Sequence, residues 1–164
     1  DSMPDLTSIA ASVGAILKEK QQSIGVAESS CGGLISATLV SIPGASAYYL
    51  GGAVNYTQGS RDALMRIPES AMVGLRASTE AYAQLNARTI RDTLGSTWAV
   101  SETGASGPTG NRYGDSAGHA CIAVAGPVEK VITVETGSSD REGNMWTFAS
   151  AAIELLKSCL KEAG

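Results

Sequence analysis

The sequence is poor in residues that hold metal ions. It has one histidine, His119, and three cysteines, Cys31, Cys121 and Cys159, at spacings unlike those of metal ligands. We therefore expect no metal site. An odd number of cysteines without a pairing pattern is typical of reduced thiols, which predicts a cytoplasmic protein without disulfides.

Long apolar runs and clusters of basic residues are also missing. No apolar run approaches the ~20 residues that cross a bilayer, so we expect no membrane contact. The net charge is −4, the pI is about 5.0, and all five lysines lie near the two ends of the chain. Without a basic stripe, the sequence predicts no binding of nucleic acid.

The composition that is present is that of a folded domain. Of the 164 residues, 43% are hydrophobic and 17% are charged, which are typical globular values. A chain of this length buries roughly 68–70% of its unfolded surface around one core. We therefore expect a single domain over residues 3–164, without repeats or linkers.

Hydrophobic periodicity predicts helices at both ends of the chain. Leu6, Val13 and Leu17 recur at helical spacing after a capping Asp5 or Thr7, and this helix is expected to end near residue 20. Further helices are expected over residues 34–40, 79–92 and 146–160.

Short β-rich runs between these helices predict strands over residues 24–27, 48–56, 98–101, 119–125 and 130–135, the last two joined at Gly126–Pro127. The stretch Thr103–Asp115 contains four glycines and a proline, and is expected to be a long loop. Strands and helices in this order predict an α/β fold, a three-layer α/β/α sandwich with a central mixed sheet.

Two glycine-rich and hydroxyl-rich turns could bind a ligand. Ser29–Gly33 joins a predicted strand to a predicted helix, where backbone N–H groups favour an anion; the alternative is an ordinary helix cap. Thr103–Gly110 is a second cluster of small donors, which makes a shared pocket plausible. Cys31 fits a small buried residue better than a nucleophile, because no histidine is near it in the sequence.

Ala27–Gly33 reads Ala-Glu-Ser-Ser-Cys-Gly-Gly and resembles the Ala-Glu-Ser-Cys-Thr-Gly-Gly signature of the CinA carboxy-terminal domain family, which includes nicotinamide-nucleotide amidohydrolases. Other stretches of the chain resemble the family in the same order, and together the resemblance covers nearly the whole chain. These stretches are residues 42–46, 50–56, 76–88, 103–108, 118–124 and 139–141. The length of the chain is similar to that of family members in which this domain stands alone.

The resemblance implies cleavage of the carboxamide of nicotinamide mononucleotide, a step of pyridine nucleotide salvage that releases ammonia and nicotinate mononucleotide. The family uses a serine, a tyrosine and a lysine, with neither metal nor cofactor. By motif position the serine falls on Ser46, the tyrosine on Tyr56 and the lysine on Arg61. The implied partner is a small phosphorylated nucleotide, and we expect a homo-oligomer.

The resemblance also implies a set of substrate-binding residues from the two turns and the segments around them. They are Ser29, Ser30, Cys31, Gly32, Gly33, Asn55, Thr103, Gly104, Ala105, Ser106, Gly107 and Arg141. For Arg141, the alternative to a phosphate ligand is an exposed arginine at the start of a helix.

Arg61 is the main departure from the family pattern. A lysine can lose its proton and activate a serine, whereas an arginine stays protonated and can only stabilise negative charge. Two alternatives therefore stay open beside the amidase. One is a catalytically weak or inactive homologue that binds a mononucleotide or a protein partner, and the other is an amidase with a different substrate.

Overall fold

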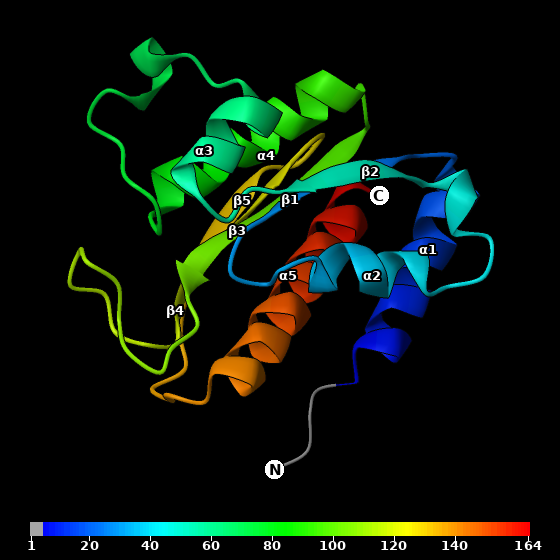
Figure 1. Cartoon of the computed structure of the whole chain (residues 1–164). Coiled ribbons are helices and arrows are strands. Elements are labelled where there is room, and N and C mark those ends of the chain that lie inside the picture. The colour runs from blue at the N-terminus through cyan, green and yellow to red at the C-terminus, as the bar shows by residue number, and fades with distance from the viewer. Residues whose placement is uncertain (1–4) are drawn as a thin grey trace.

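The computed structural model describes residues 5–164, which form a five-stranded sheet between two layers of helices (Figure 1). The strands lie in the order β2-β1-β3-β4-β5. Their bounds are β1 Ile24–Glu28, β2 Tyr49–Val54, β3 Trp98–Ala105, β4 His119–Ala125 and β5 Lys130–Glu135. The predicted α/β sandwich with a mixed sheet is confirmed, and the predicted domain start at residue 3 lies outside the described residues.

The direction of the strands decides where a site can form. β1 runs parallel to β2 and β3, while β4 is antiparallel to both β3 and β5. The carboxyl ends of β1 and β2 therefore meet, with Glu28 beside Val54, and β3 ends at the same edge of the sheet. Ligands of open α/β sheets bind at this edge.

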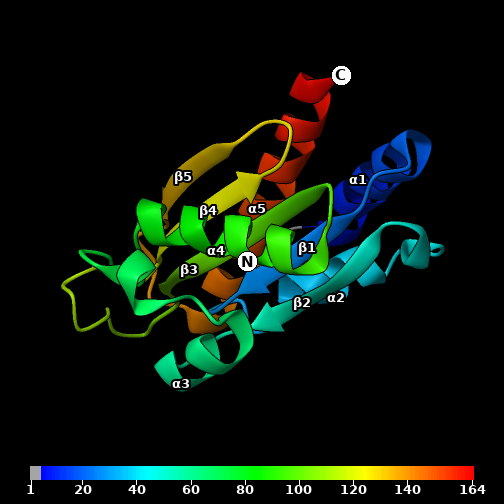
Figure 2. The same ribbon diagram turned by 90° about the horizontal axis from the view of Figure 1, so that it is seen from above.

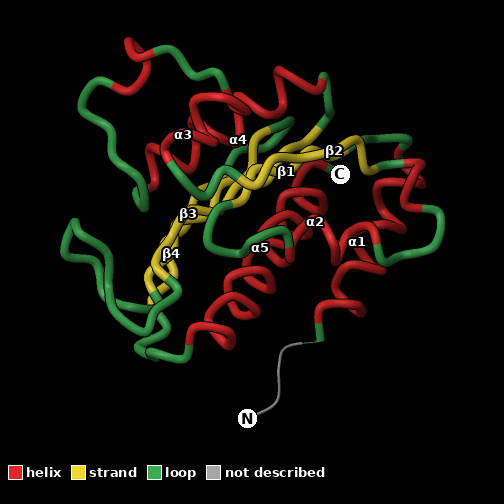
Figure 3. The backbone as a smooth tube through the Cα atoms, viewed as in Figure 1, coloured by secondary structure: helices red, strands yellow, loops and turns green. Residues whose placement is uncertain are grey.

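One face of the sheet is covered by α1 (Leu6–Lys20), α2 (Leu34–Val40) and α5 (Arg141–Ala163), which pack on one another (Figure 3). The main core lies between these helices and the sheet, with Trp98 and Phe148 fully buried. Each large apolar side chain buried there contributes roughly 1.5–3 kcal/mol. Within residues 5–164, no helix has both the length and the apolar content that crossing a bilayer requires.

The other face is covered by α4 (Glu80–Leu94), seen across the sheet in Figure 2. Alanines make much of this contact: Ala83 and Ala87 of the helix pack against Ala123 and Ala125 of β4. Small side chains on both sides let the helix lie close to the strands, so this layer is thin and has no room for larger residues.

Three regions differ most from the sequence-based prediction. α5 begins at Arg141, five residues before the predicted start at residue 146. β3 continues to Ala105, so the loop predicted from Thr103 begins later. Gly104 stays in the strand because β4 is so close that a Cβ there would lie 2.6 Å from the carbonyl oxygen of His119. Short helical turns that were not predicted follow β2: α3 (Gln58–Ser60), Arg61–Met65 and Glu69–Met72.

Candidate functional site

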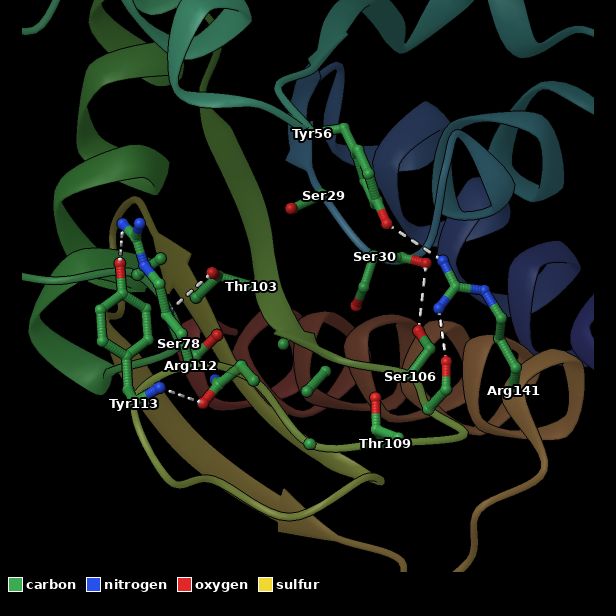
Figure 4. Close-up of a pocket in the computed structure, with 16 residues that line it drawn as sticks. Ser29, Ser30, Tyr56, Ser78, Thr103, Ser106, Thr109, Arg112, Tyr113 and Arg141 are labelled. Carbon is green, nitrogen blue, oxygen red and sulfur yellow. Dashed lines mark hydrogen bonds between the residues drawn. The ribbon is translucent and has the colours of Figure 1, made fainter.

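A hollow of about 360 Å³ opens at the carboxyl edge of the sheet (Figure 4). It lies between the ends of β1 and β3, the loop after β3 and the start of α5. Most of its polar groups are hydroxyls or guanidiniums. They belong to Ser29, Ser30, Tyr56, Ser78, Thr103, Ser106, Thr109, Arg112, Tyr113 and Arg141. Such a lining suits a polar ligand that carries negative charge.

A second hollow of about 190 Å³ adjoins the first and shares Ser29, Tyr56 and Thr103 with it. It also contains Asn55 and Arg61. The Nδ2 of Asn55 donates to a neighbouring side chain of α4, but its Oδ1 is buried without a hydrogen-bond partner among the described residues. A buried acceptor without a donor is rare, and this one is available to a ligand amide.

Arg141 connects the two sides of the pocket. It is the first residue of α5, and its guanidinium donates to the carbonyl of Gly107 and to the phenol oxygen of Tyr56, the latter at 3.0 Å (Figure 4). The α5 N-terminus is capped by Asp140, whose carboxylate accepts from the N–H of Gly143. The cap and the two hydrogen bonds hold the guanidinium over the pocket.

A second group of cations lies on the loop side. The ring of Tyr113 has the guanidinium of Arg76 4.7 Å from its centre and that of Arg112 at 5.0 Å. Arg76 also pairs with Asp115 at 2.9 Å, and this contact lowers the pKa of the Asp115 carboxyl. Arg112 also donates to the hydroxyl of Tyr113, and these two contacts with Tyr113 hold it in the lining of the pocket.

Glu28 ends β1 and uses most of the backbone donors at the start of α2. Its carboxylate, fully buried, accepts from the N–H groups of Gly33, Ile35 and Ser36 at 2.9–3.0 Å. Burial raises the pKa of Glu28, although these hydrogen bonds oppose the shift. The helix N-terminus that the sequence offered to a ligand anion is thus occupied by an anion of the chain itself.

Glu102, in β3, does the same for the turn before α2. Its carboxylate accepts from the N–H groups of Ser29 and Cys31, at 3.1 and 2.8 Å, and from the hydroxyl of Ser30. In the turn predicted to be a cradle for an anion, the N–H groups of Ser29, Cys31 and Gly33 are therefore used within the chain, and two buried carboxylates lie behind it. Ser29 and Ser30 still line the pocket, and the Glu102 carboxylate lies behind them.

The structure separates the other predicted binding residues into two groups. Thr103, Gly104, Ala105, Ser106, Gly107 and Arg141 all line the first hollow, and Asn55 lines the second. Cys31, Gly32 and Gly33 line neither. Cys31 is buried beneath the turn, and burial raises the pKa of its thiol well above the usual value. It has the character of a packed residue rather than a nucleophile.

Ser46 is not brought to the pocket of its own chain. It lies in the 3-10 turn Ala45–Ala47 that precedes β2, whereas Tyr56 follows β2 at the carboxyl edge. The six residues of β2 lie between them, a span of about 20 Å. Ser46 lines neither hollow and is exposed. The predicted grouping of Ser46 with Tyr56 and Arg61 is therefore not formed within one chain.

Arg61 does lie beside Tyr56, in the wall of the second hollow. Its guanidinium is 3.3 Å from the carboxylate of Asp62 and 5.9 Å from the ring centre of Tyr82. Partial burial alone would lower the pKa of Arg61, but the contacts with Tyr82 and Asp62 outweigh burial and raise it. Arg61 is therefore a permanent cation and does not act as a base.

Sequence reasoning missed Glu28 and Glu102 as organisers of the turn, and Arg112 and Tyr113 as pocket residues. The first two left a usable signal, because each directly follows a segment predicted as a strand, residues 24–27 and 98–101, and these two strands pair in parallel. Arg112 and Tyr113 left none, since their position depends on how the loop after β3 folds back over the pocket.

Comparisons with known proteins agree on one family. The model of the CinA C-terminal domain matches residues 6–160. A CinA-like protein of Synechococcus elongatus is 33% identical over 93% of this chain, and one of Salinibacter ruber is 35% identical over 90%. The chain spans 36% of the length of either relative.

Solved structures of the same superfamily share the fold. A competence-damaged protein (CinA) superfamily protein of Klebsiella pneumoniae superposes with a TM-score of 0.90 over 97% of this chain and 99% of its own, at 21% identity. A competence/damage inducible protein of Agrobacterium tumefaciens gives 0.88 over 97% and 98%, at 22% identity. At such identities the likeness concerns the fold alone.

Proposed function

Because the chain belongs to the CinA C-terminal domain family, we propose that it hydrolyses the carboxamide of nicotinamide mononucleotide and releases ammonia. The observation that carries the proposal is the charge arrangement of the pocket. Arg141 and Arg112 line it, while Glu102 lies behind Ser29 and Ser30 on the β1 side.

This arrangement is complementary to a pyridine mononucleotide. The ligand has a phosphate at one end and a cationic pyridinium ring at the other. Guanidiniums bind phosphate through paired, charge-assisted hydrogen bonds, and the hydroxyls of Ser106 and Thr109 lie in the same lining. A buried carboxylate attracts a pyridinium across a few ångströms of protein more strongly than it would in water. The free Oδ1 of Asn55 supplies an acceptor for the carboxamide N–H.

The reaction needs a nucleophile, a path for its proton and charge stabilisation. In the proposal the nucleophile is Ser29, which lines both hollows together with Tyr56. Its hydroxyl oxygen bonds to the carboxamide carbon, the displaced proton goes to the departing nitrogen, and water hydrolyses the acyl-serine ester. Arg141 donates to the phenol oxygen of Tyr56, so the Tyr56 hydroxyl hydrogen is free to relay the proton. Arg61 stabilises the negative charge that develops on the carbonyl oxygen.

Ammonia release from nicotinamide mononucleotide by the purified chain tests this function. We expect stoichiometric ammonia and nicotinate mononucleotide, and loss of both with Ser29→Ala or Tyr56→Phe. Activity that is unchanged in both variants would overturn the roles given to these residues. A chain that is silent on this substrate but deamidates another carboxamide would keep the reaction class and change the substrate.

A second candidate is a nucleotide-binding protein without turnover. Arg61 favours this candidate, because it takes the position of the family's lysine and cannot act as a base. None of the residues lining either hollow is a lysine that could replace it. Ligand binding without turnover stabilises the chain as the ligand concentration rises, with no product formed. Arg61→Lys separates the two candidates: a gain of ammonia release from a silent parent chain favours the binding protein.

A further inference from the structure

Asn55 and Asn86 form a pair of buried amide side chains beside the second hollow. Asn55 directly follows β2 and lines the hollow, while Asn86 belongs to α4. They are 7% and 3% exposed. The N–H of Asn55 donates to the carbonyl of Glu28, which fixes its backbone at the end of the sheet. Two amides that lie side by side away from water need a defined pattern of donors and acceptors.

The direction of both amides is set by a backbone carbonyl. A carbonyl oxygen can only accept, so the carbonyl of Tyr82 requires the amide nitrogen of Asn86, which donates to it at 2.9 Å. The Oδ1 of Asn86 then faces Asn55 and accepts from its Nδ2 at 3.0 Å. The Oδ1 of Asn55 is the atom left over, and it is buried without a hydrogen-bond partner among residues 5–164. The pair therefore places an acceptor in the wall of the second hollow.

The cations of this hollow would otherwise favour the product of the proposed reaction. Arg61 and Arg112 line the second hollow, and both attract anions. The proposed hydrolysis converts a neutral carboxamide into a carboxylate, which guanidiniums bind through charge-assisted hydrogen bonds. Without an opposing group, the carboxylate would be held tightly and its release would slow turnover.

Resting on the proposed function, we infer that Asn55 selects the carboxamide over the carboxylate, and that Asn86 is the positioning residue that fixes its direction. A carboxamide has N–H donors for the Oδ1 of Asn55, whereas a carboxylate has only acceptors and is repelled by it. A site built to hydrogen-bond one group rejects an analogue that leaves its buried polar atom unpaired. Asn86 acts without touching the ligand, since it lines neither hollow.

Binding of two nucleotides measures this selection without turnover. Each variant is made in the Ser29→Ala chain and titrated calorimetrically with nicotinamide mononucleotide and with nicotinate mononucleotide. Asn55→Leu should lower the affinity for the amide and raise that for the acid, so the ratio of the two affinities should fall at least ~10-fold. The control is Thr109→Val, which removes a hydroxyl from the first hollow and should leave the ratio unchanged.

Asn86→Leu has a signature that general damage to the pocket would not give. It frees the Asn55 amide to turn over and donate its Nδ2 to a carboxylate, while the Oδ1 can still accept from a carboxamide. The affinity for the acid should therefore rise about 5-fold and that for the amide should change little, whereas damage lowers both. Replacing both asparagines by leucine removes the buried polar partners together and so preserves the fold; this double variant should show the same lost ratio as Asn55→Leu.

The outcomes keep the inference and the proposed function apart. An unchanged ratio in Asn55→Leu and in the double variant overturns the inference, as does an Asn86→Leu chain that loses affinity for both nucleotides equally. A chain that binds neither nucleotide overturns the inference and the proposed function together. If the ratios shift as expected but the parent chain releases no ammonia from nicotinamide mononucleotide, the inference stands and the proposed hydrolysis fails.

Discussion

At the scale of single residues, Arg141 is the side chain on which ligand binding should depend most. Its guanidinium lines the pocket and is fixed by Gly107 and Tyr56. Hydrogen bonds to charged groups contribute about 1.5–3 kcal/mol each, so Arg141→Ala should raise the KM for nicotinamide mononucleotide at least ~10-fold. Arg88→Ala removes an exposed arginine paired with Glu129 and should leave KM unchanged; equal effects of the two variants would contradict the assignment.

Glu102 gives a second prediction at this scale. Glu102→Gln keeps an oxygen for the N–H groups of Ser29 and Cys31 but removes the negative charge. The affinity for nicotinamide mononucleotide, whose ring is cationic, should fall about 10-fold. The affinity for its reduced form, whose ring is neutral, should change little. Calorimetric titration with both ligands checks the difference, and an equal loss for both would show that the charge has no role.

The carboxylates also show what the sequence could not reveal about single residues. Glu28 and Glu102 are 74 positions apart in the sequence, and no local feature of either residue shows that both bind the same turn. Their grouping follows from the parallel pairing of β1 with β3, which is a long-range contact. The turn could thus be predicted as a strand-to-helix connection with free donors, but not as one whose donors are already used.

At the scale of elements, the caps of α1 and α5 form a matched pair. Asp5 accepts from the N–H of Ser8, and Asp140 from that of Gly143. Replacing either by alanine removes the cap and should lower the Tm by ~2–4 °C. Only Asp140→Ala should also weaken nucleotide binding, because α5 begins with Arg141; thermal unfolding and titration of both variants test this. A binding defect in Asp5→Ala would contradict it.

His119 connects β4 to three other segments, and its contacts should make the free energy of unfolding depend on pH. Its Nδ1 contacts Glu135 of β5, and its Nε2 contacts the carbonyl of Ser78 and, at 3.7 Å, the carboxylate of Asp115; Cys121 lies beside the ring. Burial lowers the pKa of His119, but the contacts with Glu135, Ser78 and Asp115 outweigh burial and raise it.

A raised pKa means that the folded chain binds the His119 proton more tightly than the unfolded chain does. This stabilisation is complete below the unfolded pKa of about 6.5 and is lost as pH rises through the folded pKa. The Tm of the parent chain should therefore exceed that of His119→Asn by more at pH 5 than at pH 9. A difference that stays constant or grows with pH would contradict the assignment.

Most elements could be predicted from the sequence because their signals are local. The helix over residues 6–20, the helix over 34–40 and the strands over 119–125 and 130–135 follow from periodicity and turn residues, and all are confirmed. Of the two predicted caps of the first helix, Asp5 or Thr7, the structure has Asp5. The extension of β3 to Ala105 could not be predicted, because Gly104 serves close packing against β4 rather than a turn.

At the scale of the whole molecule, the layered sheet brings chemistry from distant segments to one edge. Tyr56, Thr103 and Arg141 meet at the pocket because β1, β2 and β3 end together and α5 starts beside them. The same topology sends Ser46 to the opposite edge. Motif order along the chain predicted the family but not this separation, which depends on the direction of β2.

The proposed function requires that this pocket holds a pyridine mononucleotide between its arginines and the turn at residues 29–33. The decisive measurement is a crystal structure of the Ser29→Ala variant soaked with nicotinamide mononucleotide. We expect the phosphate within hydrogen-bond distance of Arg141 and Arg112, and the ring beside residues 29 and 30. A nucleotide bound elsewhere, or with its phosphate on the turn in front of Glu28 and Glu102, would contradict it.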